Sequence, residues 1–175
     1  MAVPHTLILN GGGLRSLVAT ALVRGEAQKQ RITVVHVLDG RPNGAIRLTH
    51  AQRQAEHHRL GDLIELDAPH IYGHGHGRQP DGKPMGALVV PQVVLATFEQ
   101  AWLRQAERII WPGSCNGEPR AMARLTEQLE LCDHLAELEA DTRPRLEPPL
   151  LELTDQQIVE LGAQLQVDWT LAWSC

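Results

Sequence analysis

Three consecutive glycines, Gly11 to Gly13, follow an apolar run and precede the start of an amphipathic helix. A turn of this kind aims backbone N–H groups at the space above a helix N-terminus, where the helix dipole favours an anion. Glycine allows the positive φ angles of such a turn and the close approach of a phosphate. The alternative is a tight strand-to-helix turn that serves packing alone. We predict a phosphate or adenine-nucleotide site formed by Asn10, Gly11, Gly12, Gly13, Leu14, Arg15 and Ser16.

Arg15 is an unusual residue for the first turn of a helix. A cation there opposes the helix dipole at a cost of about 0.3 to 1 kcal/mol, unless an anion or a carboxylate compensates. A bound phosphate would compensate, and Ser16 is placed to donate a hydrogen bond to it. Because arginine repels Mg²⁺, we expect anion binding without metal. The alternative is an arginine that points to solvent.

A histidine- and glycine-rich run begins at His70, inside a stretch rich in glycine and proline that extends to residue 86. Long irregular loops of this kind are typically functional lids or disordered segments. His70, His74 and His76 could together bind Zn²⁺, Ni²⁺ or Cu²⁺ through neutral imidazoles. A polar cover without a ligand, or a contact between one histidine and a phosphate or substrate, are the alternatives.

Three cysteines, Cys115, Cys132 and Cys175, form no C-x-x-C pair. The sequence therefore predicts neither a disulfide framework nor a complete structural zinc site. Cys132 falls on the apolar face of an expected helix and is predicted to be a core thiol. Cys115 and Glu118 are expected at the edge of a sheet where ligands bind. Since no neighbour in the sequence would lower the thiol pKa, we expect Cys115 to be inert, with a nucleophile as the alternative.

The composition fits one globular domain over residues 1–175, with 43% apolar and 21% charged residues. Sixteen basic and 21 acidic residues give a net charge of −5, which argues against a general nucleic-acid surface. No apolar run is long enough to span a membrane, and the N-terminus lacks the features of a signal peptide. We therefore expect a cytoplasmic protein.

Strand and helix patterns alternate along the chain. Apolar and β-branched runs predict strands at residues 6–9, 32–38, 63–66 and 108–111. Helices are expected after the glycine turn, over 47–60 ending at Gly61, from Pro91, around Leu125, and from Thr154 to Leu165. The last begins with a capping box of Thr154 and Gln157, and Leu153 and Ile158 are spaced as a hydrophobic staple. This order predicts an α/β, Rossmann-like parallel sheet of about five strands with helices on both faces. Its ligand crevice should be bordered by residues 10–16 and 39–41.

Two separate segments resemble known sequence families. Residues 7–16 resemble the SGGxDS signature of the PP-loop ATP pyrophosphatases, with Gly11 at the family's serine and Arg15 at its aspartate. The sequence PPLLELTDQQIVELG from residue 148 and the ending WSC resemble the closing region of 7-cyano-7-deazaguanine synthase, TPLxxLTKAEIVxLG followed by TWSC and a zinc-binding cysteine cluster. The resemblance implies an adenine nucleotide alpha hydrolase-like fold, a homodimer, and ATP-dependent adenylation of a carboxylate for nitrile formation in queuosine biosynthesis.

Several family residues are missing from this chain. Asp155 replaces the lysine of LTKAEIV, and Val90-Pro91 lacks the arginine and asparagine that follow in the family's VPxRN motif. Cys175 alone cannot supply the four ligands of a zinc site, so zinc is not expected. We therefore predict a degenerate relative that binds ATP, AMP or phosphate without full catalysis. An active ATP-dependent ligase is the alternative.

Two further residue groups carry predictions. Asp39 ends the second predicted strand, where this architecture often contacts the adenosine, and a loop-capping aspartate is the alternative. The last residues of the chain show the alternating apolar pattern of a strand, with Trp169, Leu171 and Trp173 on one side. Large apolar residues at a chain end need cover. We expect a second copy of the chain to cover them in a homodimer, and packing on the chain's own last helix is the alternative.

Overall fold

The computed structural model describes residues 3–26, 30–38, 43–67, 89–140 and 143–173. Asp39, the histidines at 70, 74 and 76, and Cys175 lie outside these ranges, so the predictions made for them are not addressed by the structure. No helix within the described ranges combines the length and the apolar character that crossing a bilayer requires.

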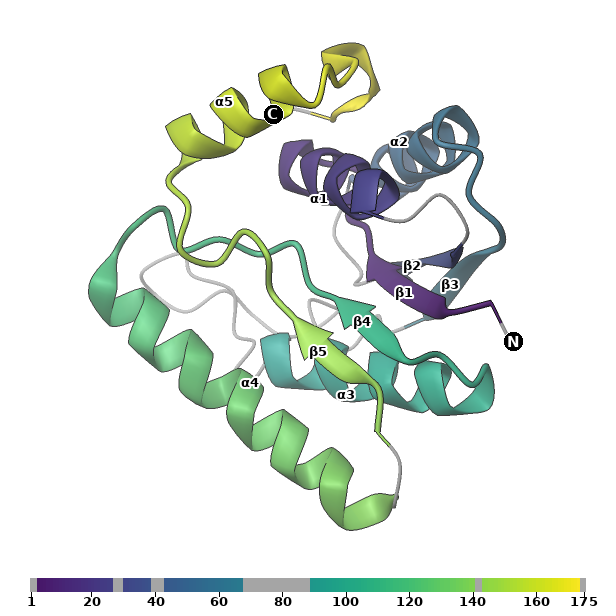
Figure 1. Ribbon diagram of the computed structural model, residues 1–175, viewed down its shortest axis with the longest axis vertical. Helices are drawn as coiled ribbons and strands as arrows, with labels where there is room; N and C mark the ends of the chain where they lie inside the picture. Colours follow the sequence, from purple (N-terminus) through teal and green to yellow (C-terminus); the bar gives the residue numbers. More distant parts are fainter. Residues whose placement is uncertain (1–2, 27–29, 39–42, 68–88, 141–142, 174–175) are drawn as a thin grey trace.

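A five-stranded parallel sheet in the order β3-β2-β1-β4-β5 forms the centre of the fold (Figure 1). The central strand β1 pairs with β2 on one side and with β4 on the other, so that Leu7 lies opposite both Thr33 and Ile109. The strands are β1 (His5–Leu9), β2 (Arg31–Leu38), β3 (Leu63–Asp67), β4 (Arg108–Ile110) and β5 (Arg145–Glu147). The predicted α/β architecture is confirmed, and the four strands located from the sequence agree to within one residue at each end.

Helices cover both faces of the sheet, as predicted. Figure 1 shows α1, α2 and α5 on one face and α3 and α4 on the other. The helices are α1 (Leu14–Glu26), α2 (Gly44–His57), α3 (Val89–Leu103), α4 (Pro119–Glu139) and α5 (Asp155–Gln164), followed by the short 3-10 helix η1 (Trp169–Leu171).

The predicted bounds of α2 were wrong by three residues at both ends. The helix starts directly after Asn43 and stops at His57 rather than at Gly61. Arg59, with a φ of 50°, breaks the helical geometry before the glycine is reached. The backbone reversal that the prediction assigned to glycine is therefore made by an arginine.

Alternating residues of β1 pack into two separate apolar cores. Leu7 and Leu9 join Phe98 of α3 and Cys132 of α4 on one face. Ile8 joins the other core, to which α1 contributes most and β2, α2, β4 and α5 contribute one or two buried residues each. Cys132 is 2% exposed, which confirms the predicted core thiol. Burial on both faces explains why the strands read as continuous apolar runs.

The C-terminal segment confirms one prediction and corrects another. The capping box of Thr154 and Gln157 is present, and Leu153 packs against the core that contains Ile158. Residues 169–171 form a 3-10 helix instead of the predicted strand, and Trp173 alone makes a bridge, to Gly13. The Asp168 side chain accepts from the N–H of Thr170, which caps this short helix and bends the chain away from an extended path.

Candidate functional site

A cavity of about 370 Å³ opens at the carboxyl end of the sheet. It lies where the strand order reverses, between β1, β2 and β4, which is where open parallel sheets bind their ligands. Its volume is within the range of small-molecule sites. The lining residues are Leu9, Asn10, Gly11, Arg15, Ser16, Val35, Val37, Arg47, Val89, Val90, Val93, Trp111, Pro112 and Gly113.

The glycine turn forms one wall of this cavity. Gly12 has a φ of 75°, and a Cβ added there would lie 2.2 Å from the carbonyl oxygen of Arg47. Gly12 is therefore required by backbone conformation and by the close approach of α2. Of the predicted residues, Asn10, Gly11, Arg15 and Ser16 line the cavity, while Gly12, Gly13 and Leu14 do not.

Two backbone donors of the turn are paired with side chains of the same segment. The N–H of Gly11 donates to Ser16 Oγ at 3.0 Å, and the N–H of Gly12 donates to Asn10 Oδ1 at 2.7 Å. Because Ser16 Oγ accepts from Gly11, its hydroxyl proton can be donated towards the cavity. The first N–H groups of α1 have no acceptor within their helix. This arrangement suits an anion.

A buried network of two amide side chains and a histidine holds the glycine turn in place. The Asn10 side chain donates to Gln54 Oε1 at 2.9 Å, and Gln54 Nε2 donates to the carbonyl oxygens of Gly12 and Leu171, each at 3.1 Å. A ring nitrogen of His36 lies 2.7 Å from the carbonyl oxygen of Asn10. Gln54 and His36 are fully buried, and Asn10 is 2% exposed. We call Asn10, His36 and Gln54 the anchoring network.

The C-terminal segment is attached to the same turn. The N–H of Trp173 donates to the carbonyl oxygen of Gly12 at 2.8 Å, and a ring nitrogen of His50 lies 2.9 Å from the carbonyl oxygen of Leu171. Together with Gln54, these contacts fix η1 and the residues after it against the glycine turn. The segment expected from the sequence to lie at a dimer interface is thus in contact with the chain's own glycine turn.

Arg15 lies at the mouth of the cavity and forms an ion pair with Asp155. Its Nη2 is 2.7 Å from Asp155 Oδ1, and its Nη1 donates to the carbonyl oxygen of Ser114 at 3.2 Å. The side chains are 40% and 57% exposed. The carboxylate compensates the cation in the first turn of α1, so Arg15 is not a purely solvated side chain. Arg15 and Asp155 each stand where the resembled families have a different residue, and in this chain the two contact each other.

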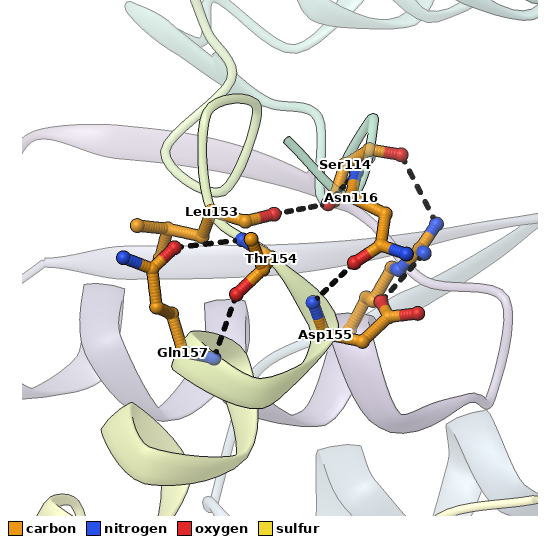
Figure 2. A network of polar contacts seen from close by, with 7 residues as sticks. Ser114, Asn116, Leu153, Thr154, Asp155 and Gln157 are labelled. Atoms are coloured by element: carbon orange, nitrogen blue, oxygen red, sulfur yellow. Dashed lines mark hydrogen bonds and ion pairs between the residues drawn. The ribbon is translucent and has the colours of Figure 1, made fainter. Parts of the chain in front are cut away.

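Polar contacts extend this ion pair to the loop after β4 (Figure 2). Asn116 Oδ1 accepts from the N–H of Asp155 at 2.8 Å, and Ser114 Oγ donates to the carbonyl oxygen of Leu153 at 2.6 Å. We call Arg15, Ser114, Asn116 and Asp155 the mouth network. It joins the N-termini of α1 and α5 to the β4–α4 loop.

Arg47 also lines the cavity and was not among the site residues predicted from the sequence. Its Nε donates to the carbonyl oxygen of Gly11 at 3.1 Å, so a second guanidinium lines the same wall as Arg15. The sequence could have indicated Arg47, because it falls in the first turn of the helix that follows β2. That turn lies at the same edge of the sheet as the glycine turn. The opposite wall is apolar, and Trp111 lies close against Gly113, where a Cβ would meet the indole ring at 1.7 Å.

Cys115 and Glu118 are the other candidate residues that the structure describes. Cys115 is partly buried, and burial raises the pKa of its thiol more than the charge of Arg15 lowers it. This fits the expected inert thiol. The Glu118 side chain caps α4 by accepting from the N–H of Arg120. Within the described ranges, no group of three histidine, cysteine, aspartate or glutamate residues is placed to hold a metal ion.

No protein-family model and no curated protein matches the sequence. Solved structures do match its fold. The U34-tRNA thiolase NcsA of Methanococcus maripaludis aligns with a TM-score of 0.63 at 13% identity, over 98% of this chain and 60% of that one. NAD+ synthetase from Burkholderia pseudomallei aligns with a TM-score of 0.58 at 16% identity, over 99% and 63%. The fold is adenine nucleotide alpha hydrolase-like.

A third structure, NMN synthetase from Francisella tularensis, aligns with a TM-score of 0.57 at 17% identity, over 97% of this chain and 65% of that one. The chain thus spans between 60% and 65% of the length of these three proteins. At these identities the likeness establishes the fold and no particular activity.

Proposed function

We propose that the chain binds a phosphate-bearing ligand, with an adenine nucleotide as the best fit, in the cavity beside residues 10–16. One observation carries the proposal. The N-terminus of α1, the Ser16 hydroxyl and the guanidinium groups of Arg15 and Arg47 converge on one wall of a cavity at the topological switch point. Guanidinium groups and helix N-termini are the donors that proteins commonly use for phosphate.

The opposite wall supports a ligand with an apolar, planar part. Val35 and Val37 come from β2, Val90 and Val93 from α3, and Trp111 follows β4. Such a wall fits a base better than it fits free phosphate. Asp39, which follows β2 in the sequence, is proposed to contact the adenosine.

Metal-free binding is part of the proposal. The cation at the mouth of the cavity is a guanidinium, which repels Mg²⁺ and pairs directly with anionic oxygen. For this reason we propose a degenerate relative of the PP-loop enzymes that binds its ligand without releasing pyrophosphate. The second candidate, ATP-dependent adenylation of a carboxylate as in 7-cyano-7-deazaguanine synthase, is favoured by the alignment of nearly the whole chain with two synthetases.

Isothermal titration with AMP, ATP and inorganic phosphate, each in EDTA and in Mg²⁺, tests the proposal. We expect binding of a nucleotide in EDTA and no gain in affinity on adding Mg²⁺. Absence of binding by all three ligands would refute it. A parallel assay of pyrophosphate release with ATP, Mg²⁺ and a carboxylate substrate separates the two candidates, since robust release supports the ligase.

A further inference from the structure

The carbonyl group of Gly12 accepts hydrogen bonds from two distant parts of the chain. One donor is the N–H of Trp173, at 2.8 Å, and the other is Gln54 Nε2, at 3.1 Å. Trp173 also forms a parallel bridge with Gly13, as a very short strand would. Neither Trp173 nor Gln54 is among the described residues that line the cavity. The Gly12 carbonyl therefore points towards the C-terminal segment and the protein interior rather than into the cavity.

The direction of this carbonyl also sets the direction of the next backbone donor. A peptide unit is planar and trans, so the N–H of Gly13 points opposite to the C=O of Gly12. Gly13 is the residue before α1, and its carbonyl oxygen accepts from the N–H of Leu17 at 3.1 Å. Its N–H thus belongs to the end of the helix that attracts anions. Holding the Gly12 carbonyl against Trp173 keeps this N–H on the other side of the turn.

The peptide between Gly12 and Gly13 is the part of the turn that most needs such a restraint. Because both residues lack a Cβ, the ψ of Gly12 and the φ of Gly13 can change together at little steric cost. A rotation of this peptide by half a turn would exchange the positions of the N–H and the C=O. Backbone N–H groups attract an anion, whereas a carbonyl oxygen repels it. The rotated peptide would therefore oppose the binding of a phosphate.

The segment that contains Trp173 is anchored by contacts of its own. A Cβ on Gly162 would lie 2.2 Å from the Trp169 ring, so this tryptophan packs on α5. The carbonyl oxygen of Leu171 lies 2.9 Å from a ring nitrogen of His50. Residues 169–173 were expected from the sequence to form a dimer interface, with packing on the last helix as the alternative. The contact between Trp169 and α5 agrees with that alternative.

We propose that residues 169–173 position the glycine turn for its ligand, by holding the Gly12–Gly13 peptide in the orientation that presents the Gly13 N–H to an anion. The role rests on the proposed function, in which the turn binds a phosphate-bearing ligand. Trp173 is a positioning residue that acts through its backbone N–H. Attachment of the segment and occupancy of the cavity are then coupled equilibria, and such coupling is reciprocal. The ligand strengthens the attachment by the same factor by which the attachment strengthens binding.

A pair of variants separates the N–H of residue 173 from its ring. Trp173→Pro and Trp173→Ala both lose the indole, and only proline lacks the N–H that bonds to Gly12. Ala172 has a φ of −86° and a ψ of 132°, which suits a residue before proline. AMP titration in EDTA should show about three- to tenfold weaker binding by Trp173→Pro than by Trp173→Ala, the effect of about one hydrogen bond. Equal affinities of the two variants would overturn the proposal.

Amide exchange without ligand tests the restraint on the turn independently of the proposed function. The N–H groups of Gly11 and Gly12 are bonded to Ser16 Oγ and Asn10 Oδ1. They should exchange at least about threefold faster in Trp173→Pro than in Trp173→Ala, because the turn opens more often. Equal exchange rates would overturn the proposal even where AMP binds. If the wild type binds neither nucleotide nor phosphate, the proposed function fails, whereas faster exchange in Trp173→Pro would still support the restraint.

The reciprocal effect is measured on the wild type. Saturating AMP should slow the exchange of the Trp173 N–H by about three- to tenfold, the same factor by which the attachment strengthens binding. The N–H of Arg31, which donates to the carbonyl oxygen of Pro4 at the opposite end of the sheet, is the control and should be unaffected. An unchanged exchange rate at Trp173 under saturating AMP would contradict the coupling. Circular dichroism of both Trp173 variants confirms that the chain remains folded.

Discussion

The glycine turn is held by two networks that differ in burial. The anchoring network of Asn10, His36 and Gln54 is almost completely shielded from water. In the mouth network, the Arg15 and Asp155 side chains are 40% and 57% exposed. A buried polar group that loses its partner costs about 1 to 3 kcal/mol, whereas an exposed ion pair contributes about 0 to 1 kcal/mol. The anchoring network therefore fixes the turn, whereas the mouth network is weak enough for the proposed ligand to displace Asp155 from Arg15.

The largest effect is expected from the turn itself. Gly12→Ala should lower the free energy of unfolding by about 4 kcal/mol, because strain at positive φ and overpacking against α2 add. The Cβ would lie 2.2 Å from a backbone oxygen, which cannot move without shifting α2. Chemical denaturation measures this loss. Gly13→Ala is the control, since its Cβ would meet only the carbonyl oxygen of Trp173, at 3.9 Å. A loss as large in Gly13→Ala would contradict this explanation.

The anchoring network should show the next largest effect. Gln54→Leu keeps a similar side-chain volume and removes the partner of the Asn10 amide, so unfolding should become easier by about 1 to 3 kcal/mol. Gln156→Leu is the matched control, because Gln156 is exposed and bonds only to Glu160 among the described residues. Equal denaturation midpoints for the two variants would show that the anchoring network does not stabilise the turn.

The mouth network should have the smallest effect on stability. Asp155→Asn removes the counter-charge of Arg15, and the free energy of unfolding should change by less than about 1 kcal/mol. Metal-free affinity for AMP should rise by a factor of about 2 to 5, since the ligand no longer competes with a carboxylate. Asp62→Asn is the control, because Asp62 forms a similarly exposed pair with Arg31. An unchanged affinity in Asp155→Asn would indicate that Asp155 does not compete with the ligand.

Local sequence signals singled out Asn10 of the anchoring network and Arg15 and Asp155 of the mouth network, but predicted none of the contacts within either network. The three glycines and the apolar strand before them are adjacent in the chain, so the turn and four strands could be located. Arg15 and Asp155 are 140 residues apart, and Gln54 is 44 residues from Asn10. These contacts are created by the parallel crossovers that bring α2 and α5 beside α1. The three-residue strand β5 was missed because so short a segment carries no periodic pattern.

The role of Arg15 in metal-free binding is the central claim, and AMP titration of Arg15→Asp in EDTA tests it most directly. Replacing the guanidinium with a carboxylate should weaken binding by about 1 to 3 kcal/mol, roughly 5- to 150-fold. Arg31→Asp makes the same charge change at a remote exposed ion pair and should bind like the wild type. If Arg15→Asp binds AMP as tightly as the wild type, Arg15 serves only as the structural partner of Asp155, and the claim is contradicted.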